Sequence, residues 1–135
     1  MASGTLLGFD FGPRKIGVAV GQEVTATAAP LTTLRCRNDK PDWPRIEALI
    51  KEWHPCAAVV GLPFNMDDTE TVIAPLARRF ARQIEGRFGL PVHLVDERLT
   101  TIEARRLLGP KANSPGAVDA MAAKLLLETW LSERH

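Results

Sequence analysis

Three acidic residues, Asp10, Glu97 and Asp119, belong to apolar segments rather than to polar faces. They stand inside or at the ends of the runs 6–11, 90–97 and 117–123. An ionised carboxylate in such surroundings is costly unless it is paired, hydrogen-bonded or bound to a metal ion. One shared metal site would account for all three residues, and an all-oxygen donor set favours Mg²⁺ or Mn²⁺ over Zn²⁺.

The segment around Asp119 has the periodicity of a helix, and this places Asp119 on one of its sides. At 100° per residue, Asp119 shares a face with apolar residues and lies away from Lys124 and Glu128. The apolar residues on that face are Ala122, Ala123, Leu126 and Trp130. We therefore expect Asp119 to face the protein interior, either as a metal ligand or as a structural hydrogen-bonding residue.

Asp10 and Glu97 each close a strand-like segment, and open α/β sheets bind ligands at the carboxyl ends of their strands. Three carboxylates about 4 Å apart would repel by several kcal/mol per pair, a conflict that a divalent cation removes. Histidine offers no competing site, because His54, His93 and His135 share no metal-ligand spacing.

Polar residues in the neighbouring loops are candidates for binding a phosphate-containing substrate. They are Arg14, Lys15, Asn65, Arg98 and Thr100. Four of them have an alternative interpretation that the sequence leaves open: Arg14 and Lys15 as solvated charges of a hairpin turn, Asn65 as a turn-forming residue, and Thr100 as a helix N-cap.

The elements that must position these residues follow a βββ-α-β-α-β-α-α order. Residues 5–34 predict a three-stranded antiparallel meander, with breaks at Gly12-Pro13 and Gly21 and a third strand from Val24 to Leu34. The later strands are short apolar runs, which are typical of buried parallel strands. They cover residues 57–62 and 92–95.

Helices are predicted between these strands. The first is capped by Asp42 with Pro44 in its first turn, and the second runs from about Thr69 to Phe88. A short helix at 101–108 and a final helix opened by Ser114-Pro115 complete the chain. The sequence therefore predicts an α/β domain over residues 1–135, with a mixed five-stranded sheet (the meander plus two parallel strands) and helices on both faces.

Composition excludes several classes of protein. The chain has 135 residues, a net charge of +1 and no run of 18 apolar residues, so a membrane span is not expected. Met1 to Gly4 lack the basic start of a secretory signal, and two cysteines without CxxC spacing suit a reducing compartment. We therefore expect a cytoplasmic protein with no membrane partner.

The motifs that carry these candidates resemble those of the YqgF family, described as pre-16S ribosomal RNA nucleases and as Holliday-junction-resolvase-like. The similar segments are Asp10-Phe11-Gly12, residues 14–19, Gly61-Leu62-Pro63 with residues 65–67, residues 95–101, and Val118-Asp119-Ala120. The resemblance spans roughly residues 5–132 and implies a ribonuclease-H-like fold. It also implies a nuclease with Asp10, Glu97 and Asp119 as its acidic catalytic residues, acting in 5′-end maturation of 16S ribosomal RNA.

The leading hypothesis is metal-dependent phosphodiester hydrolysis, with two Mg²⁺ or Mn²⁺ ions held by the three carboxylates. The nucleic-acid partner is expected to be an rRNA precursor, with branched DNA as an alternative, and the protein is expected to be a monomer or a homodimer. A Holliday junction resolvase and a non-catalytic ribosome-assembly module are the alternative functions. A sugar-kinase-like ATPase is disfavoured because such enzymes close two domains around the nucleotide, and this chain has the length of one.

Overall fold

The protein is described by a computed structural model covering residues 4–38, 40–63, 71–97 and 100–133, without the side chains of residues 100–102. Its centre is a five-stranded sheet with the order β3-β2-β1-β4-β5. The strands are β1 (Thr5–Phe11), β2 (Lys15–Gln22), β3 (Thr27–Arg35), β4 (Ala57–Pro63) and β5 (Val92–Glu97). The pairs β1–β2 and β2–β3 are antiparallel, whereas β1–β4 and β4–β5 are parallel. The predicted mixed sheet is confirmed.

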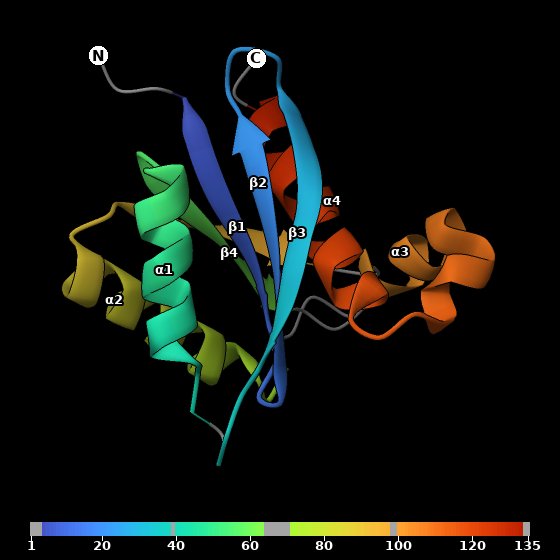
Figure 1. Cartoon of the computed structure of the whole chain (residues 1–135), viewed down its shortest axis with the longest axis horizontal. Helices are drawn as coiled ribbons and strands as arrows, with labels where there is room; N and C mark the ends of the chain where they lie inside the picture. The colour runs from blue at the N-terminus through green and yellow to red at the C-terminus, as the bar shows by residue number, and fades with distance from the viewer. Residues whose placement is uncertain (1–3, 39, 64–70, 98–99, 134–135) are drawn as a thin grey trace.

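Helices cover both faces of this sheet (Figure 1). They are α1 (Trp43–Trp53), α2 (Ala74–Phe88), α3 (Thr100–Leu108) and α4 (Ala117–Glu133), with a 3-10 helix, η1 (Gly109–Asn113), between the last two. α1 and α2 lie on one face and α4 lies on the other, while α3 and η1 extend sideways from the N-terminal end of α4 (Figure 1). None of the helices in the described ranges is long and apolar enough to cross a bilayer.

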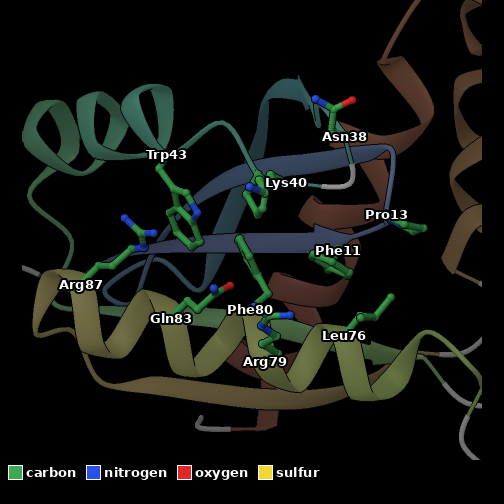
Figure 2. A pocket seen from close by; sticks show the side chains of 11 residues that line it. Phe11, Pro13, Asn38, Lys40, Trp43, Leu76, Arg79, Phe80, Gln83 and Arg87 are labelled. Atoms are coloured by element: carbon green, nitrogen blue, oxygen red, sulfur yellow. The ribbon is translucent and has the colours of Figure 1, made fainter.

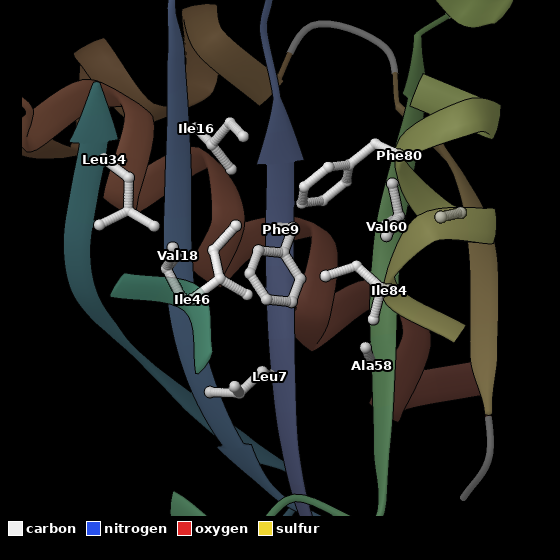
Figure 3. Close-up of a cluster of buried hydrophobic side chains, with 11 residues drawn as sticks. Leu7, Phe9, Ile16, Val18, Leu34, Ile46, Ala58, Val60, Phe80 and Ile84 are labelled. Atoms are coloured by element: carbon white, nitrogen blue, oxygen red, sulfur yellow. The ribbon is translucent and has the colours of Figure 1, made fainter. Parts of the chain in front are cut away.

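The α1–α2 face buries the larger apolar cluster. Side chains alternate along β1, so Leu7 and Phe9 point to this face, where Ile46 of α1 and Phe80 of α2 meet them. The aromatic contacts continue outward, because Phe11 and Trp43 also pack against Phe80 and border a hollow between the two helices (Figure 2). Figure 3 shows the inner part of the cluster, in which Phe9 lies between Ile46 and Ile84. This packing fixes β1 against both helices.

The α4 face is packed unusually closely because glycines replace side chains in the sheet. A Cβ atom on Gly8 would lie 3.1 Å from Cβ of Leu127, and one on Gly21 would lie 2.8 Å from Cδ2 of the same leucine. On Gly17 it would fall only 1.9 Å from the carbonyl oxygen of Asp119. The absence of side chains at these positions lets the backbone of α4 rest directly on the sheet.

Three element boundaries predicted from the sequence are wrong, and the first is the start of the third strand. The third strand begins at Thr27, not Val24, because residues 23–26 turn the chain with Ala26 at φ 53°. Val24 is 88% exposed in that turn, so it does not pack against the sheet in the way that gives valine its preference for strands.

The second and fourth long helices also begin later than predicted. α2 starts at Ala74 with Pro75 in its first turn, and residues 71–73 lie outside the helix. Ser114 and Pro115 belong to a turn, and α4 begins at Ala117 after Gly116, whose φ of 77° interrupts the helix. The Thr33 hydroxyl, which donates to the Gly116 carbonyl at 2.6 Å, holds that turn against β3.

Candidate active site

The fold brings Asp10, Glu97 and Asp119 to one edge of the sheet from three separate elements. Asp10 is the next-to-last residue of β1, Glu97 is the last residue of β5, and Asp119 lies in the first turn of α4. Since β1, β4 and β5 are parallel, their carboxyl ends share this edge. Asp10 pairs with Gly17 across the β1–β2 ladder, and Gly17 is the residue on which the Asp119 backbone rests.

Glu97 is the last residue of β5, and its side chain lies over Gly61 of the neighbouring strand β4. It is buried, with 9% of its surface exposed. A Cβ atom on Gly61 of β4 would lie 2.6 Å from Oε2 of Glu97 and 2.9 Å from Cδ2 of Leu126 in α4. The glycine therefore provides the space in which the Glu97 carboxylate turns toward α4 and Asp10.

Asp119 is more open to solvent and has a cationic partner. Its side chain is 27% exposed, and its Oδ2 lies 3.4 Å from Nζ of Lys15, the first residue of β2. The rest of the predicted inward face is confirmed, because Ala122, Ala123 and Leu126 are buried. Asp119 thus stands where the buried face of α4 reaches the surface.

The electrostatics of Asp10 demonstrate that the three carboxylates interact. Burial raises the pKa of the Asp10 carboxyl well above its usual value, and the charge of Glu97, a hydrogen bond to Glu97 and the charge of Asp119 raise it further. The three carboxylates are therefore close enough to repel one another when they are ionised.

The donor set suits a hard divalent cation. All three side chains offer only oxygen, and a bound Mg²⁺ or Mn²⁺ would compensate their negative charge. Among the described residues, no three His, Cys, Asp or Glu side chains are already arranged as a complete metal-holding group. The Asp119 carboxylate instead forms an ion pair with the ammonium group of Lys15.

The predicted substrate-binding residues are only partly located. Arg14 and Lys15 are exposed in and after the β1–β2 turn, and Lys15 pairs with Asp119. Asn65 and Arg98 lie outside the described residues. Thr100 is the first residue of α3, with its side chain not described.

Sequence reasoning missed the supporting role of two glycines. Gly17 and Gly61 lie inside strands, where glycine is unfavourable unless another group approaches closely. Each occupies a position where any side chain would collide with an active-site residue. Their position within apolar strand segments was the available signal.

The five-stranded mixed sheet with its acidic edge is a ribonuclease-H-like α/β fold, the class to which Holliday junction resolvases of known structure belong. The structure of Thermus thermophilus RuvC in complex with a Holliday junction substrate is similar to this one, with a TM-score of 0.57 and 18% sequence identity. The similarity covers 96% of this chain and 95% of RuvC. The fowlpox virus resolvase bound to junction DNA gives 0.56 at 12% identity, over 96% and 98% of the two chains. At such identities these likenesses establish the fold.

The chain belongs to the RuvX family, also called YqgF, whose model, described as "Holliday junction resolvase", matches residues 4–133. A relative from Azotobacter vinelandii is 56% identical over 133 residues, covering 96% of this chain and 94% of the relative. A relative from Pectobacterium carotovorum is 50% identical over 139 residues and covers both chains completely. Both are named "Putative pre-16S rRNA nuclease". The family resemblance predicted from the motifs is confirmed.

Proposed function

We propose that this protein is a metal-dependent nuclease that hydrolyses phosphodiester bonds during 5′-end maturation of pre-16S rRNA in the cytoplasm. The observation that carries the proposal is that Asp10, Glu97 and Asp119 converge at one edge of the sheet, where burial and the charges of Glu97 and Asp119 raise the pKa of Asp10. Such a concentration of negative charge requires cations to compensate it, and bound divalent cations can in turn bind the phosphates of a substrate. The names of close full-length relatives supply the choice of substrate.

Asp10, Glu97 and Asp119 are the residues that would hold Mg²⁺ or Mn²⁺, as two ions. Divalent ions in such a site lower the pKa of bound water and stabilise charge on the leaving oxygen. Burial of Glu97 in the space above Gly61 limits the directions in which its carboxylate can move. Asp119 is the adjustable member, because it is partly exposed and can exchange its contact with Lys15 for a metal ion.

Lys15 and Arg14 provide positive charge on the solvent side of the site. The Lys15 side chain is 50% exposed and already reaches Asp119, so it can contact a phosphate next to the scissile bond. Arg98, Asn65 and Thr100 complete the proposed substrate contacts because they directly follow or lie near the carboxyl ends of β4 and β5. These contacts act on the backbone of the nucleic acid and would make binding sensitive to salt.

The proposal is tested by incubating the protein with an rRNA precursor that contains the 16S 5′ flank, in Mg²⁺ and in Mn²⁺. Asp10→Asn and Asp119→Asn should lose at least about 100-fold in cleavage rate if they hold the metal. Glu128→Gln is the matched control, since Glu128 lies on α4 and pairs only loosely with Lys124 at 4.0 Å. Cleavage by the two Asn variants at the wild-type rate would refute the proposal.

A four-way DNA junction in the same assay separates the alternative functions. The family description and the fold of the solved resolvases support junction cleavage as the second candidate. A resolvase requires two active sites in a symmetric homodimer, so sedimentation should then show a dimer. A binding module without catalysis would retain the RNA in the absence of metal and cleave neither substrate.

A further inference from the structure

The hollow between α1 and α2 is a second candidate binding site, and it is lined by Phe11 and Pro13, which follow Asp10 in the chain. Its volume is about 670 Å³, within the range of ligand sites in proteins. Figure 2 shows that its walls come from the end of β1, the segment before α1, and one side of α2. The residues that matter for its chemistry are Phe11, Trp43, Phe80, Lys40, Arg79 and Arg87. We call it the aromatic groove.

Its floor consists of aromatic rings stacked on one another. Phe80 is buried, and the rings of Phe11 and Trp43 have their centroids 5.1 and 5.6 Å from it. The Trp43 and Phe80 rings are nearly parallel, with 21° between their planes. Phe11 and Trp43 are both partly exposed. Phe11 and Trp43 therefore leave part of their apolar surface open to solvent at the floor of the groove.

A planar cation already occupies one position over this floor. The guanidinium carbon of Arg87 lies 4.2 Å from the centroid of the Trp43 ring. This contact places a delocalised cation over the Trp43 ring. A nucleobase has the same shape requirement, and it can stack on the indole or on the guanidinium.

The rim of the aromatic groove is positively charged. Lys40, Arg79 and Arg87 line it, and no carboxylate is among its lining residues in the described ranges. The adjoining hollow adds Arg35 and Arg37, together with one carboxylate, Asp42. Flat apolar surface bordered by cations is the combination that single-stranded nucleic acids require, with bases stacked on rings and phosphates near the cations.

The aromatic groove and the acidic site are joined through the β1–β2 turn. Asp10 and Phe11 are consecutive, so their side chains point to opposite faces of the sheet. Pro13 of the same turn also lines the groove, and Lys15, the partner of Asp119, pairs with Arg35 across the β2–β3 ladder. A strand that leaves the acidic site around this turn would pass Lys15 before it reaches the cations that line the aromatic groove.

We infer that the aromatic groove binds unpaired nucleotides of the substrate strand that flank the scissile bond. The inference rests on the proposed nuclease function for the identity of that strand. It assigns Trp43 to base stacking, and Lys40, Arg79 and Arg87 to the phosphates. The enzyme then prefers substrates with a single-stranded flank over fully paired ones.

The test is binding of a fluorescein-labelled single-stranded RNA of about 12 nucleotides to the full chain in EDTA, where the strand stays intact. Arg79→Ala should bind several-fold more weakly and should reduce the slope of log K against log salt by about 0.7, the value for one phosphate contact to a single strand. Arg82→Ala is the matched control, because Arg82 is exposed on the same helix but lines a separate hollow beside β5. It should bind like wild type.

Trp43 tests the stacking part separately. Trp43→Leu should weaken binding by about 10-fold, within the range for losing one stacked base, whereas Trp43→Phe should restore most of it. Thermal unfolding of both variants identifies any loss caused by misfolding, since Trp43 also packs on Phe80. Equal binding by wild type, Arg79→Ala and a folded Trp43→Leu would overturn the inference, as would groove-dependent binding of an acidic peptide in place of RNA.

The outcomes also separate this inference from the proposed function. If the wild type cleaves the rRNA precursor but Arg79→Ala and Arg82→Ala bind and cleave alike, the inference fails and the function stands. If no cleavage occurs in Mg²⁺ or Mn²⁺ while Arg79→Ala alone weakens RNA binding, the nuclease proposal fails and the groove remains a nucleic-acid site.

Discussion

Replacing Gly17 with alanine should inactivate the enzyme without touching an acidic residue. The added Cβ atom would lie 1.9 Å from the carbonyl oxygen of Asp119, 2.3 Å from its carbonyl carbon and 3.0 Å from the nitrogen of Ala120. Since all three are backbone atoms, no side-chain rotation relieves the collision. The first turn of α4 must therefore move away from β2, and Asp119 must move with it.

The size of the effect follows from this geometry. Real Cβ contacts do not fall below 3.0 Å, so the Asp119 carbonyl must retreat by about 1 Å or more. A displacement of about 1 Å in a catalytic group costs on the order of 100-fold in rate. Overpacking of this kind typically costs about 1–3 kcal/mol of stability, so most of the protein should stay folded at 25 °C.

The assay measures the cleavage rate in Mg²⁺ together with the free energy of unfolding in urea. The control is Gly86→Ala in α2, where an added Cβ meets no atom within 4 Å. That change should leave the rate unaltered and raise stability by about 0.5–1 kcal/mol, the helix preference of alanine over glycine. Wild-type cleavage by Gly17→Ala would refute the claim that close packing of α4 on β2 positions Asp119.

Three further predictions concern the charges of the site. In EDTA, the free energy of unfolding should fall as the pH rises from about 3.9, the pKa of Asp10 in the unfolded chain, through its higher pKa in the folded protein. The reason is that ionising Asp10 costs more in the folded state. Urea unfolding at several pH values should show a steeper fall for wild type than for Asp10→Asn. Saturating Mg²⁺ should raise the melting temperature of wild type, since a ligand at 100 times its Kd stabilises by about 2.7 kcal/mol, but not that of Asp10→Asn; an equal rise in both would place the binding elsewhere. Lys15→Ala should change stability by less than about 1 kcal/mol, because the pair with Asp119 is partly exposed. It should nevertheless reduce the salt dependence of RNA binding by the amount expected for about one phosphate contact. An unchanged salt slope would exclude a contact between Lys15 and the substrate.

The acidic residues could be proposed from the sequence because their positions break a strong local rule. Carboxylates at the ends of apolar strands, or on the inward face of a helix, can be recognised from the sequence pattern alone. The mixed sheet could be predicted for a similar reason, since short connections predict the meander and apolar runs predict the parallel strands. What the sequence could not provide is the contact between Lys15 and Asp119, which depends on how the β1–β2 turn and α4 meet in space.

The aromatic groove illustrates the opposite case. Phe11, Lys40, Trp43, Arg79 and Arg87 come from distant parts of the chain, and each is locally ordinary. Trp43 fits the start of a helix, and Arg79 and Arg87 fit a solvated helix face. Only the packing of α1 and α2 on the same side of β1 turns them into one surface, so no linear pattern announces it.

The placement of α4 has a consequence for the newly made chain. This helix supplies Asp119 and also the leucines and Trp130 that cover the second face of the sheet. A nascent chain that has emerged only as far as β5 has Asp10 and Glu97 but leaves that face of the sheet bare. We therefore expect completion of the fold and appearance of the full acidic set to coincide, so that translation intermediates near ribosomal RNA carry no cutting activity.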